Sequence, residues 1–412
     1  MRMDRRSLLT GARALVLEAS TRLRWMLPYV TRVERQRRRR VIQHDPGRRS
    51  ASAPGVIVAD KTPTQVDVEI AGRLLGAYRA TADAAGPARS ARGSDVWMLI
   101  TAQQSRFASI LARGNPHELA SYLCNVSRHD ASIGITQGRE EHKRIRRDRA
   151  YRDYLALMAK DKLVSLAEAV GALPVENPEQ GSYGASIHAD LDELVVRISE
   201  RLGFDIAPPD IDGGLFKLRT AHGLFGERDA NAIFTAWLLR SILRGAEPAR
   251  ICEIGAGSGR VAYWSRRLGS NSYTIVDLPH VNAVQGYYLL KSLPEDSIVL
   301  YGEQPARSDA AFTVWPSHAV GELEGREYDL VLNQDSMPEM SHDTVEDYLR
   351  WIRSVCRGVF VSINHESKPA YGAGFAQVSV PEIIREIGGF ELQERYPYWL
   401  RRGYVVEVYR TL

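Results

Sequence analysis

Residues 251–260 read Ile-Cys-Glu-Ile-Gly-Ala-Gly-Ser-Gly-Arg, and this stretch decides the expected fold. A short apolar strand enters it, and a helix beginning near Val261 leaves it. Three alternate glycines therefore occupy the turn, where backbone without Cβ atoms can approach a ligand closely. The pattern predicts a cofactor bound over the end of the first strand of a sheet. Glycines that only make a turn, with no ligand, are the alternative.

Two cofactor classes use such a turn. A dinucleotide fingerprint, G-x-G-x-x-G/A, has a third small residue where the helix packs closely and faces pyrophosphate, and here that position is Arg260. The glycines fall instead at Gly255, Gly257 and Gly259, with Glu253 two residues before the first. This spacing resembles motif I of the class I S-adenosylmethionine-dependent methyltransferases, E/D-x-G-x-G-x-G. The resemblance implies that S-adenosylmethionine lies over the glycines and that Glu253 helps to hold its cationic methionine part.

A carboxylate also ends the next apolar segment. Asp277 follows Tyr273–Val276, about 20 residues beyond the glycine turn, which is the spacing at which an acid accepts hydrogen bonds from ribose hydroxyls. Both cofactor classes contain a ribose. Asp277 therefore supports a nucleoside cofactor without choosing between them.

The C-terminal half alternates short apolar segments with segments of helix length. We expect strands at Arg250–Ile254, Tyr273–Val276, Ile298–Tyr301, Tyr328–Leu332, Val359–Ile363, Glu391–Tyr396 and Tyr404–Tyr409. Helical crossovers produce parallel strands, whereas the short connection between the last two strands predicts an antiparallel pair. The expected fold is α/β: a Rossmann-like class I methyltransferase sheet, parallel with an antiparallel last strand, preceded by an all-helical region.

The N-terminal half has helical periodicity. One stripe of apolar residues starts at Leu191 and stops at Gly203, a suitable helix terminator. The charged stretch from Glu140 predicts the exposed start of one long helix, and Asp229 is the expected N-cap of another. The chain is predicted to have four parts. They are a basic segment (residues 1–50), a linker (51–63), a helical accessory region that binds the acceptor (64–225) and the methyltransferase domain (226–412).

Charge is distributed unevenly along the 412 residues. Residues 1–50 contain 14 arginines and four acidic residues, a net +10, so the overall +4 leaves −6 for the rest. An acidic body argues against nucleic acid as the substrate. The basic segment is either a solvated extension or a helix on an anionic membrane face, and it contains no uninterrupted apolar span. The three scattered cysteines indicate a reducing cytoplasm, so we expect a cytoplasmic protein, with contact at the inner membrane face as a hypothesis.

Two further stretches of sequence resemble one particular family of methyltransferases. Ile275–Pro279, Gln285 and Tyr287–Leu289, together with Asn333–Met340, resemble the sugar O-methyltransferase family of bacteria over roughly residues 225–412, and more loosely over the helical half. This resemblance implies a small-molecule or glycan acceptor that is methylated on a hydroxyl. It gives neither the hydroxyl position nor the oligomeric state.

A sugar hydroxyl needs a base to take its proton, and such a base should follow the carboxyl end of a strand. Asp335 and Glu339 follow one predicted strand, and His365 follows the next, where a carboxylate could orient its ring. The alternative is that these carboxylates cap a helix and that the histidine is bonded to backbone. No spacing is diagnostic of a metal, although the candidate ligands for one would be Asp335, Glu339, His342 and Asp343. Three aromatic residues could stack against a sugar ring, namely Tyr371, Tyr398 and Trp399. They are explained equally well as residues of the core or of the rim of the site.

The sequence therefore predicts an S-adenosylmethionine-dependent O-methyltransferase acting on a sugar or glycan hydroxyl. The predicted catalytic residues are His365, Asp335 and Glu339. Two other functions stay open: an NAD(P)-dependent oxidoreductase on a Rossmann fold, which Arg260 disfavours, and a non-catalytic scaffold of the same fold.

Overall fold

The computed structural model describes residues 53–84, 96–176, 186–243, 248–269, 272–294, 297–303, 312–368 and 377–412. Residues 53–175 and 190–412 belong to one compact unit. Of a second unit only Glu176 and residues 186–189 are described, with Ser186–His188 forming a short 3-10 helix (η5). The basic segment predicted at residues 1–50 lies outside the described residues.

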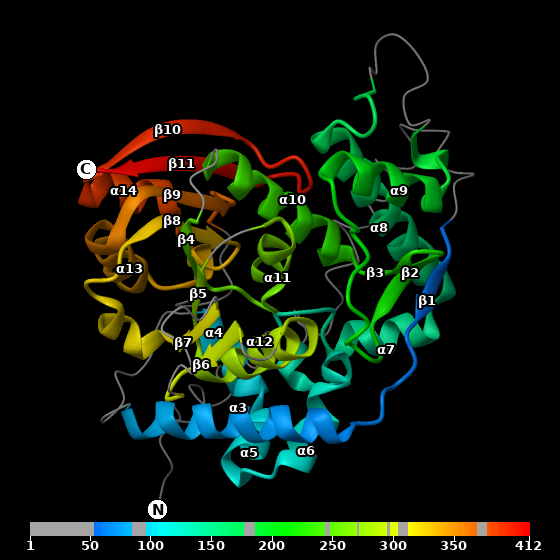
Figure 1. The fold of residues 1–412 in the computed structure, drawn as a ribbon, viewed down its shortest axis with the longest axis horizontal. Coiled ribbons are helices and arrows are strands. Elements are labelled where there is room, and N and C mark those ends of the chain that lie inside the picture. Colours follow the sequence, from blue (N-terminus) through cyan, green and yellow to red (C-terminus); the bar gives the residue numbers. More distant parts are fainter. Residues whose placement is uncertain are drawn as a thin grey trace, which may run out of the picture. The chain divides into compact units, whose positions relative to one another are not determined.

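A large sheet forms the centre of the C-terminal half (Figure 1). Across the sheet the strands are β10 (Phe390–Pro397), β11 (Val405–Thr411), β9 (Cys356–Asn364), β8 (Tyr328–Gln334), β4 (Arg250–Ile254), β5 (Ser272–Asp277), β7 (Phe312–Pro316) and β6 (Ile298–Leu300). Strands β9 to β6 are parallel, and β11 runs antiparallel to both β9 and β10. The predicted Rossmann-like sheet, parallel with an antiparallel last strand, is confirmed.

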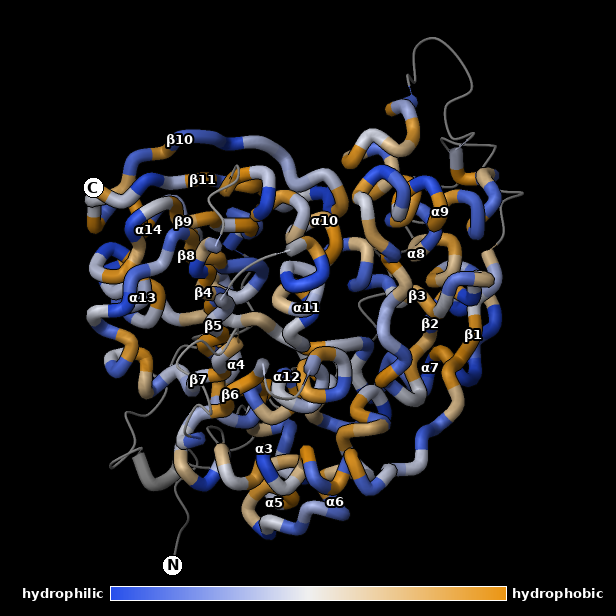
Figure 2. Tube along the Cα trace, in the orientation of Figure 1, coloured by the Kyte–Doolittle hydropathy of each residue, from blue (hydrophilic) through white to orange (hydrophobic). Residues whose placement is uncertain are grey.

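Helices cover both faces of this sheet. The helices of the C-terminal half are α10 (Glu227–Leu243), α11 (Arg260–Arg267), α12 (Pro279–Ser292), α13 (His342–Val355) and α14 (Val380–Ile387). A core cluster joins α13 and α14 to β4, β8 and β9, while α10, α11 and α12 pack together in a separate group. The central strands are hydrophobic along their length, as burial on both faces requires, whereas the edge strand β10 is hydrophilic (Figure 2).

The N-terminal half contains helices and also a small sheet. Its helices are α3 (Gln65–Ala84), α4 (Val96–Gln103), α5 (Ser105–Arg113), α6 (Pro116–Leu123), α7 (Arg139–Arg147), α8 (Arg149–Val170) and α9 (Leu191–Leu202), with 3-10 turns η3 (Val126–Arg128) and η4 (Asp130–Ser132). The small antiparallel sheet consists of β1 (Gly55–Ile57), β2 (Phe216–Thr220) and β3 (Gly223–Phe225). The all-helical prediction is therefore wrong on this point. These strands are three to five residues long, which gives periodicity too little to work with.

Other differences have local causes. Asp148 divides the single helix predicted from Glu140, because its side chain accepts a hydrogen bond from Tyr151 N and caps α8. Asp229 is not the N-cap of α10 but the third residue of the helix, where its Oδ2 accepts a hydrogen bond from Gly226 N at 2.7 Å. Strand β7 was missed, whereas the helix ending at Gly203 (φ +79°) is confirmed.

A buried carboxylate ties α3 to α12. Asp67 is 3% exposed and accepts hydrogen bonds from Thr64, from Tyr287 Oη at 2.7 Å and from Lys291 Nζ at 2.9 Å. Burial alone would raise the pKa of Asp67, but these donors outweigh it and lower the pKa to about 2. The N-terminal half is thus attached to the large sheet by an ionic contact as well as by apolar packing.

None of the described helices has the length and apolar content needed to cross a bilayer. The three cysteines are buried and form no disulfide.

Candidate functional site

The glycine turn lies where the strand order reverses. Strand β4 pairs with β5 on one side and with β8 on the other, so Ile254 has Val276 and Asn333 as its neighbours. Gly255 N then donates to Val276 O at 2.9 Å. The carboxyl ends of β4, β5 and β8 consequently meet at one edge, which is the position where open α/β sheets bind ligands.

Each glycine of the turn has a positive φ, but their surroundings differ. A Cβ on Gly255 (φ +74°) would lie 2.1 Å from Ser336 Oγ, so only glycine fits against the β8 end. A Cβ on Gly257 (φ +58°) would meet nothing within 4 Å. Gly259 (φ +76°) is the N-cap of α11 and packs near Gln285. The turn is therefore closed on the protein side at Gly255 and open at Gly257.

Asp277 lies directly beside this turn. Its half-buried carboxylate accepts hydrogen bonds from the backbone N–H groups of Leu278, Gly257 and Ala256, and from the Gln285 amide at 2.5 Å. Burial outweighs these donors and raises the pKa of Asp277 to about 6. The structure thus brings together the two motifs that the sequence analysis assigned to the cofactor.

Glu253 is located below the turn, inside the sheet. It is 2% exposed, and its Oε2 accepts a hydrogen bond from Tyr273 Oη at 2.8 Å. Burial raises the pKa of Glu253 to about 8, because the sheet interior disfavours the charged form. Its contribution to holding a methionine part stays a prediction.

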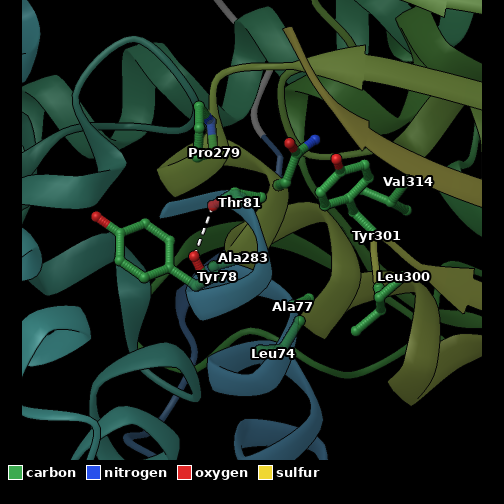
Figure 3. Close-up of a pocket in the computed structure, with 10 residues that line it drawn as sticks. Leu74, Ala77, Tyr78, Thr81, Pro279, Ala283, Leu300, Tyr301 and Val314 are labelled. Atoms are coloured by element: carbon green, nitrogen blue, oxygen red, sulfur yellow. Dashed lines mark hydrogen bonds between the residues drawn. The ribbon is translucent and has the colours of Figure 1, made fainter. Parts of the chain in front are cut away.

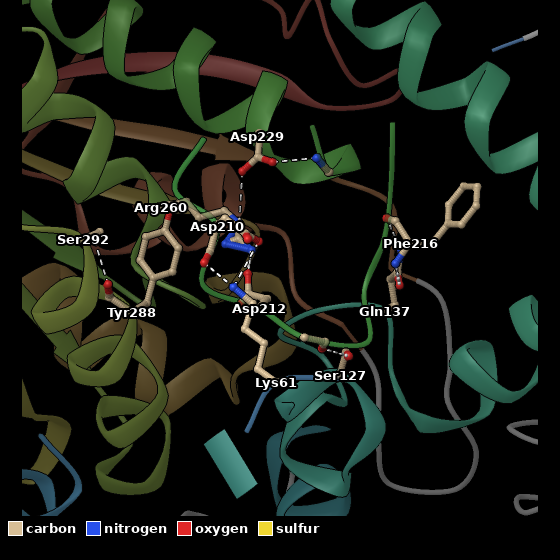
Figure 4. Close-up of polar contacts among 12 residues, drawn as sticks. Lys61, Ser127, Gln137, Asp210, Asp212, Phe216, Asp229, Arg260, Tyr288 and Ser292 are labelled. Atoms are coloured by element: carbon tan, nitrogen blue, oxygen red, sulfur yellow. Dashed lines mark hydrogen bonds and ion pairs between the residues drawn. The ribbon is translucent and has the colours of Figure 1, made fainter. Parts of the chain in front are cut away.

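Arg260 occupies a closed ionic cage at the start of α11 (Figure 4). Its Nη2 donates to Asp212 Oδ2 at 2.7 Å, its Nε lies 3.4 Å from Asp229 Oδ1, and its Cζ stands 4.8 Å from the centre of the Tyr288 ring. All three charged side chains are at most 9% exposed. The residue that broke the dinucleotide pattern is therefore a buried cation between two carboxylates.

The Asp212 loop also connects to the N-terminal half. Lys61 pairs with Asp210, and Ser127 Oγ donates to Gly213 O at 2.9 Å (Figure 4). At the other end of the loop, Arg267 donates to Asp205 O. The loop thus runs along α11 from its last turn to the Arg260 cage.

Asparagines fix the ends of β4, β8 and β9 relative to one another. Asn333 donates to Ile254 O at 2.9 Å and to Ser336 Oγ at 2.6 Å, and it accepts from Asn364 at 2.9 Å. Asn364 Oδ1 in turn accepts from Asp335 N at 3.0 Å. These amides form a buried support for the residues after β8.

Both carboxylate oxygens of Asp335 are occupied. Arg401 donates to Oδ2, and Tyr404 Oη donates to Oδ1 at 2.5 Å. Among the described residues Asp335 is the one non-glycine with a positive φ, +61°. Since this backbone conformation is unfavourable for aspartate, its surroundings must hold it there.

Glu339 ends the 3-10 turn η8 (Met337–Glu339) and is half-buried. The side chain of Trp97 from α4 lies near its carboxylate and favours the ionised form. Burial and the nearby Asp335 raise the pKa of Glu339 to about 7, against the lowering effects of Trp97, Arg401 and Arg228. Trp97 was not found from the sequence, because a single aromatic residue on a short helix carries no signal of its own.

His365 lies on the same side of the sheet but is oriented differently from the prediction. Its Nδ1 is 3.1 Å from Ser367 O, and its ring meets the Tyr404 ring edge-on, with centroids 5.6 Å apart. Among the described residues it forms no ion pair with Asp335 or Glu339. The expectation that a carboxylate orients His365 is therefore wrong, and backbone does so instead.

The candidate aromatic residues and metal ligands differ in burial and in contacts. Tyr398 is 2% exposed and bonded to Thr235, which makes it a core residue, whereas Trp399 is 49% exposed and Tyr371 lies outside the described residues. His342 contacts Glu386 at 2.8 Å rather than the β8 loop. Within the described part of the chain no three histidine, cysteine or acidic side chains are grouped as metal ligands would be.

A small hollow lies between α3 and the start of α12 (Figure 3). Its lining residues are Leu74, Ala77, Tyr78, Thr81, Pro279, Asn282, Ala283, Leu300, Tyr301 and Val314. It begins two residues after Asp277, on the β7 side of the glycine turn.

Comparison with protein-family models gives no match for the sequence, and comparison with curated proteins gives none either. Solved structures resemble about 45% of the chain. The PH0226 protein of Pyrococcus horikoshii has 13% identity and a TM-score of 0.34, covering 45% of this chain and 92% of its own. The glycopeptide N-methyltransferase MtfA with S-adenosylmethionine has 15% identity and a TM-score of 0.33, covering 44% and 94%. Magnesium protoporphyrin IX methyltransferase of Synechocystis has 16% and 0.32, covering 44% and 81%.

These similarities are too low to carry an activity to this chain. The class of fold rests on the sheet itself, in which antiparallel β11 is inserted between β9 and β10 beside an otherwise parallel sheet. This is the Rossmann-like sheet of the class I methyltransferase type.

Proposed function

We propose that the chain transfers a methyl group from S-adenosylmethionine to a hydroxyl of a sugar or glycan. The observation that carries the proposal is the glycine turn at the reversal of strand order. Room is left over Gly257, and the half-buried Asp277 carboxylate stands beside it. A nucleoside whose ribose bonds Asp277 fits this arrangement.

The Arg260 cage favours S-adenosylmethionine over a dinucleotide. Pyrophosphate binds at a helix N-terminus because the terminus is electropositive. Here two carboxylates surround one guanidinium at the first turn of α11, which makes that terminus net negative. A sulfonium cofactor tolerates such a charge better than an anionic one.

Different residues of the chain have different roles at this edge of the sheet. Gly255, Gly257 and Gly259 give the cofactor access to the backbone, Asp277 binds the ribose, and Glu253 supports the turn from below. When bound, S-adenosylmethionine supplies an electrophilic methyl carbon: the acceptor oxygen forms the new C–O bond as the C–S electron pair leaves with sulfur.

The acceptor hydroxyl must lose its proton as this bond forms, and the candidate proton acceptors after β8 and β9 are Asp335, Glu339 and His365. All three lie at the carboxyl edge of the sheet. The choice of a sugar or glycan rests on the resemblance of Asn333–Met340 and Ile275–Pro279 to the sugar O-methyltransferases. The N-terminal helices, which supply Trp97 to this edge, would shape the acceptor pocket.

Calorimetric titration of the purified chain with S-adenosylmethionine, S-adenosylhomocysteine and NAD⁺ tests the cofactor. We expect heat with the first two and none with NAD⁺, and weaker binding by Asp277→Ala. Binding of NAD⁺ alone would favour an oxidoreductase and overturn the proposal.

The acceptor is then sought with methyl-labelled S-adenosylmethionine and a fractionated cell extract. Label in a carbohydrate fraction supports the proposal, and label only in protein or another small molecule contradicts the sugar acceptor. Cofactor binding without labelled product from any fraction would favour a scaffold.

Contact with an anionic membrane through residues 1–50 is a separate proposal, which would place a lipid-linked or nascent glycan within reach. Deleting residues 1–50 should abolish binding to anionic liposomes at low salt. Unchanged binding by the shortened chain would refute it.

A further inference from the structure

We propose that Gln285 of α12 is a positioning residue for the cofactor, because its buried amide fixes the rotation of the Asp277 carboxylate that binds the ribose. This inference rests on the proposed S-adenosylmethionine site and adds to it a residue from the helix that follows Asp277. It is carried by a hydrogen bond between the two side chains and by the packing that holds the amide in place.

Each oxygen of the Asp277 carboxylate accepts a hydrogen bond from a different donor. Oδ1 accepts from Leu278 N at 2.7 Å, and Oδ2 accepts from Gln285 Nε2 at 2.5 Å. Among the described residues, Gln285 supplies the one side-chain hydrogen bond to this carboxylate. The terminal torsion of an aspartate has only a broad preference, so a donor on each oxygen is needed to fix the plane of the group.

These two bonds leave the carboxylate able to bind a ligand. An ionised carboxylate offers about four acceptor sites, so each oxygen of Asp277 keeps free lone pairs after Leu278 and Gln285 have donated. The group is half-buried and lies beside the open side of Gly257. A ribose has two neighbouring hydroxyls, and both can donate to one carboxylate only when its plane has the matching rotation.

The Gln285 amide is itself held in a closed environment. The residue is 0% exposed, and its Oε1 lies 2.9 Å from the side-chain amide of Asn282, one turn earlier on α12. A Cβ on Gly259 would lie 3.8 Å from Gln285 Cα, so α12 packs against the end of the glycine turn. The same helix is attached to α3, because Tyr287 Oη donates to Asp67 at 2.7 Å. The amide therefore has a fixed position from which to orient the carboxylate.

The same hydrogen bond favours the ionised form of Asp277. Burial raises the pKa of Asp277 to about 6, and the Gln285 donor acts in the opposite direction. The titratable group that interacts with it from the adjacent strand β4 is Glu253, whose own pKa the Asp277 charge raises. Without the Gln285 donor, the pKa of Asp277 should rise, and a ligand that needs the ionised carboxylate should be lost at a higher pH.

The first test is calorimetric titration of the full chain with S-adenosylhomocysteine between pH 5 and pH 8. Gln285→Met keeps the length of the side chain but removes the donor. It should bind about tenfold more weakly at pH 8, and its loss of affinity on acidification should begin about one pH unit higher than in the wild type. The ligand's own titration cancels in this comparison. Affinity lowered by the same factor at every pH would indicate a merely structural effect and overturn the proposal.

The matched control is Ser292→Ala, which removes a side-chain hydrogen bond to Tyr288 O two turns further along α12. It should change neither the affinity at pH 8 nor its pH dependence. A second variant, Gln285→Glu, has the size of the natural residue and places a like charge beside Asp277. It should move the pH dependence at least as far as Gln285→Met does, because a neighbouring carboxylate disfavours ionisation. If Gln285→Met fails to fold, an unshifted pH dependence in Gln285→Glu refutes the proposal.

A measurement without ligand separates this inference from the proposed function. In the full chain labelled with ¹³C at the aspartate carboxyl carbons, the signal that Asp277→Asn removes should titrate near pH 6, and about one pH unit higher in Gln285→Met. An unchanged titration refutes the role of Gln285 even where the cofactor binds. A shifted titration without calorimetric heat from S-adenosylmethionine or S-adenosylhomocysteine leaves the pairing intact and overturns the cofactor site.

Discussion

Replacing Arg260 with methionine tests the ionic cage most directly. The change removes a cation that is at most 9% exposed, and it leaves Asp212 and Asp229 buried without their partner. Breaking a buried ion pair in this way costs about 3–5 kcal/mol, because the remaining charges keep their desolvation penalty. With a urea dependence of about 3 kcal/mol per molar, the unfolding midpoint should fall by roughly 1 M or more.

The assay is urea unfolding followed by circular dichroism, on the wild type, on Arg260→Met and on Arg260→Met combined with Asp212→Asn. The double variant should recover part of the loss, since it removes one of the unpaired charges. The matched control is Arg350→Met, which breaks the exposed pair with Glu346 and should leave the midpoint unchanged. A midpoint for Arg260→Met equal to that of the control would refute the reasoning.

Three more outcomes follow from the site and its supports. Gly257→Ala should cost only about 1–2 kcal/mol of stability, from its left-handed φ, and should lose cofactor affinity, measured by calorimetry, because its Cβ enters the open side of the turn. Gly255→Ala should be destabilised further by its clash with Ser336. Asp277→Asn should weaken S-adenosylmethionine binding about tenfold or more, and wild-type affinity should fall as the pH drops through about 6, since protonation removes the acceptor charge. Asp67 has a folded-state pKa of about 2, below its unfolded value, so its ionised form contributes about 2 kcal/mol to the free energy of unfolding. This contribution is present above pH 4 and is lost as the pH falls towards 2. Urea midpoints of the wild type and of Asp67→Asn, measured against pH, check this.

The sequence predicted the elements whose signal is local. The glycine turn, the carboxylate at Asp277 and the antiparallel ending of the sheet each depend on spacing along one strand and its loop, and all three are found in the structure. Strand β7 was missed because it follows a stretch without periodicity, and the small sheet was missed because β1 and β2 are about 160 residues apart.

The contacts of the candidate bases could not be predicted, since each depends on long-range packing. Asp335 meets Arg401 across 66 positions, and Glu339 lies near Trp97 from the other half of the chain. Arg260 showed only that the dinucleotide pattern was broken. Its two partners, Asp212 and Asp229, lie 48 and 31 positions before it, and no local rule pairs them.

These long-range contacts cross the predicted boundary between the helical region and the methyltransferase domain at residue 225. Asp67 joins α3 to α12, the Asp212 loop joins the N-terminal half to α11, and Trp97 lies near Glu339 in the turn that follows β8. Each links the N-terminal half to an element that borders the cofactor turn or the acceptor edge. The N-terminal half is therefore part of the support of the site rather than a separable attachment. We expect residues 226–412 expressed alone to bind S-adenosylmethionine more weakly than the whole chain, because the Arg260 cage would lose Asp212 and retain Asp229 alone.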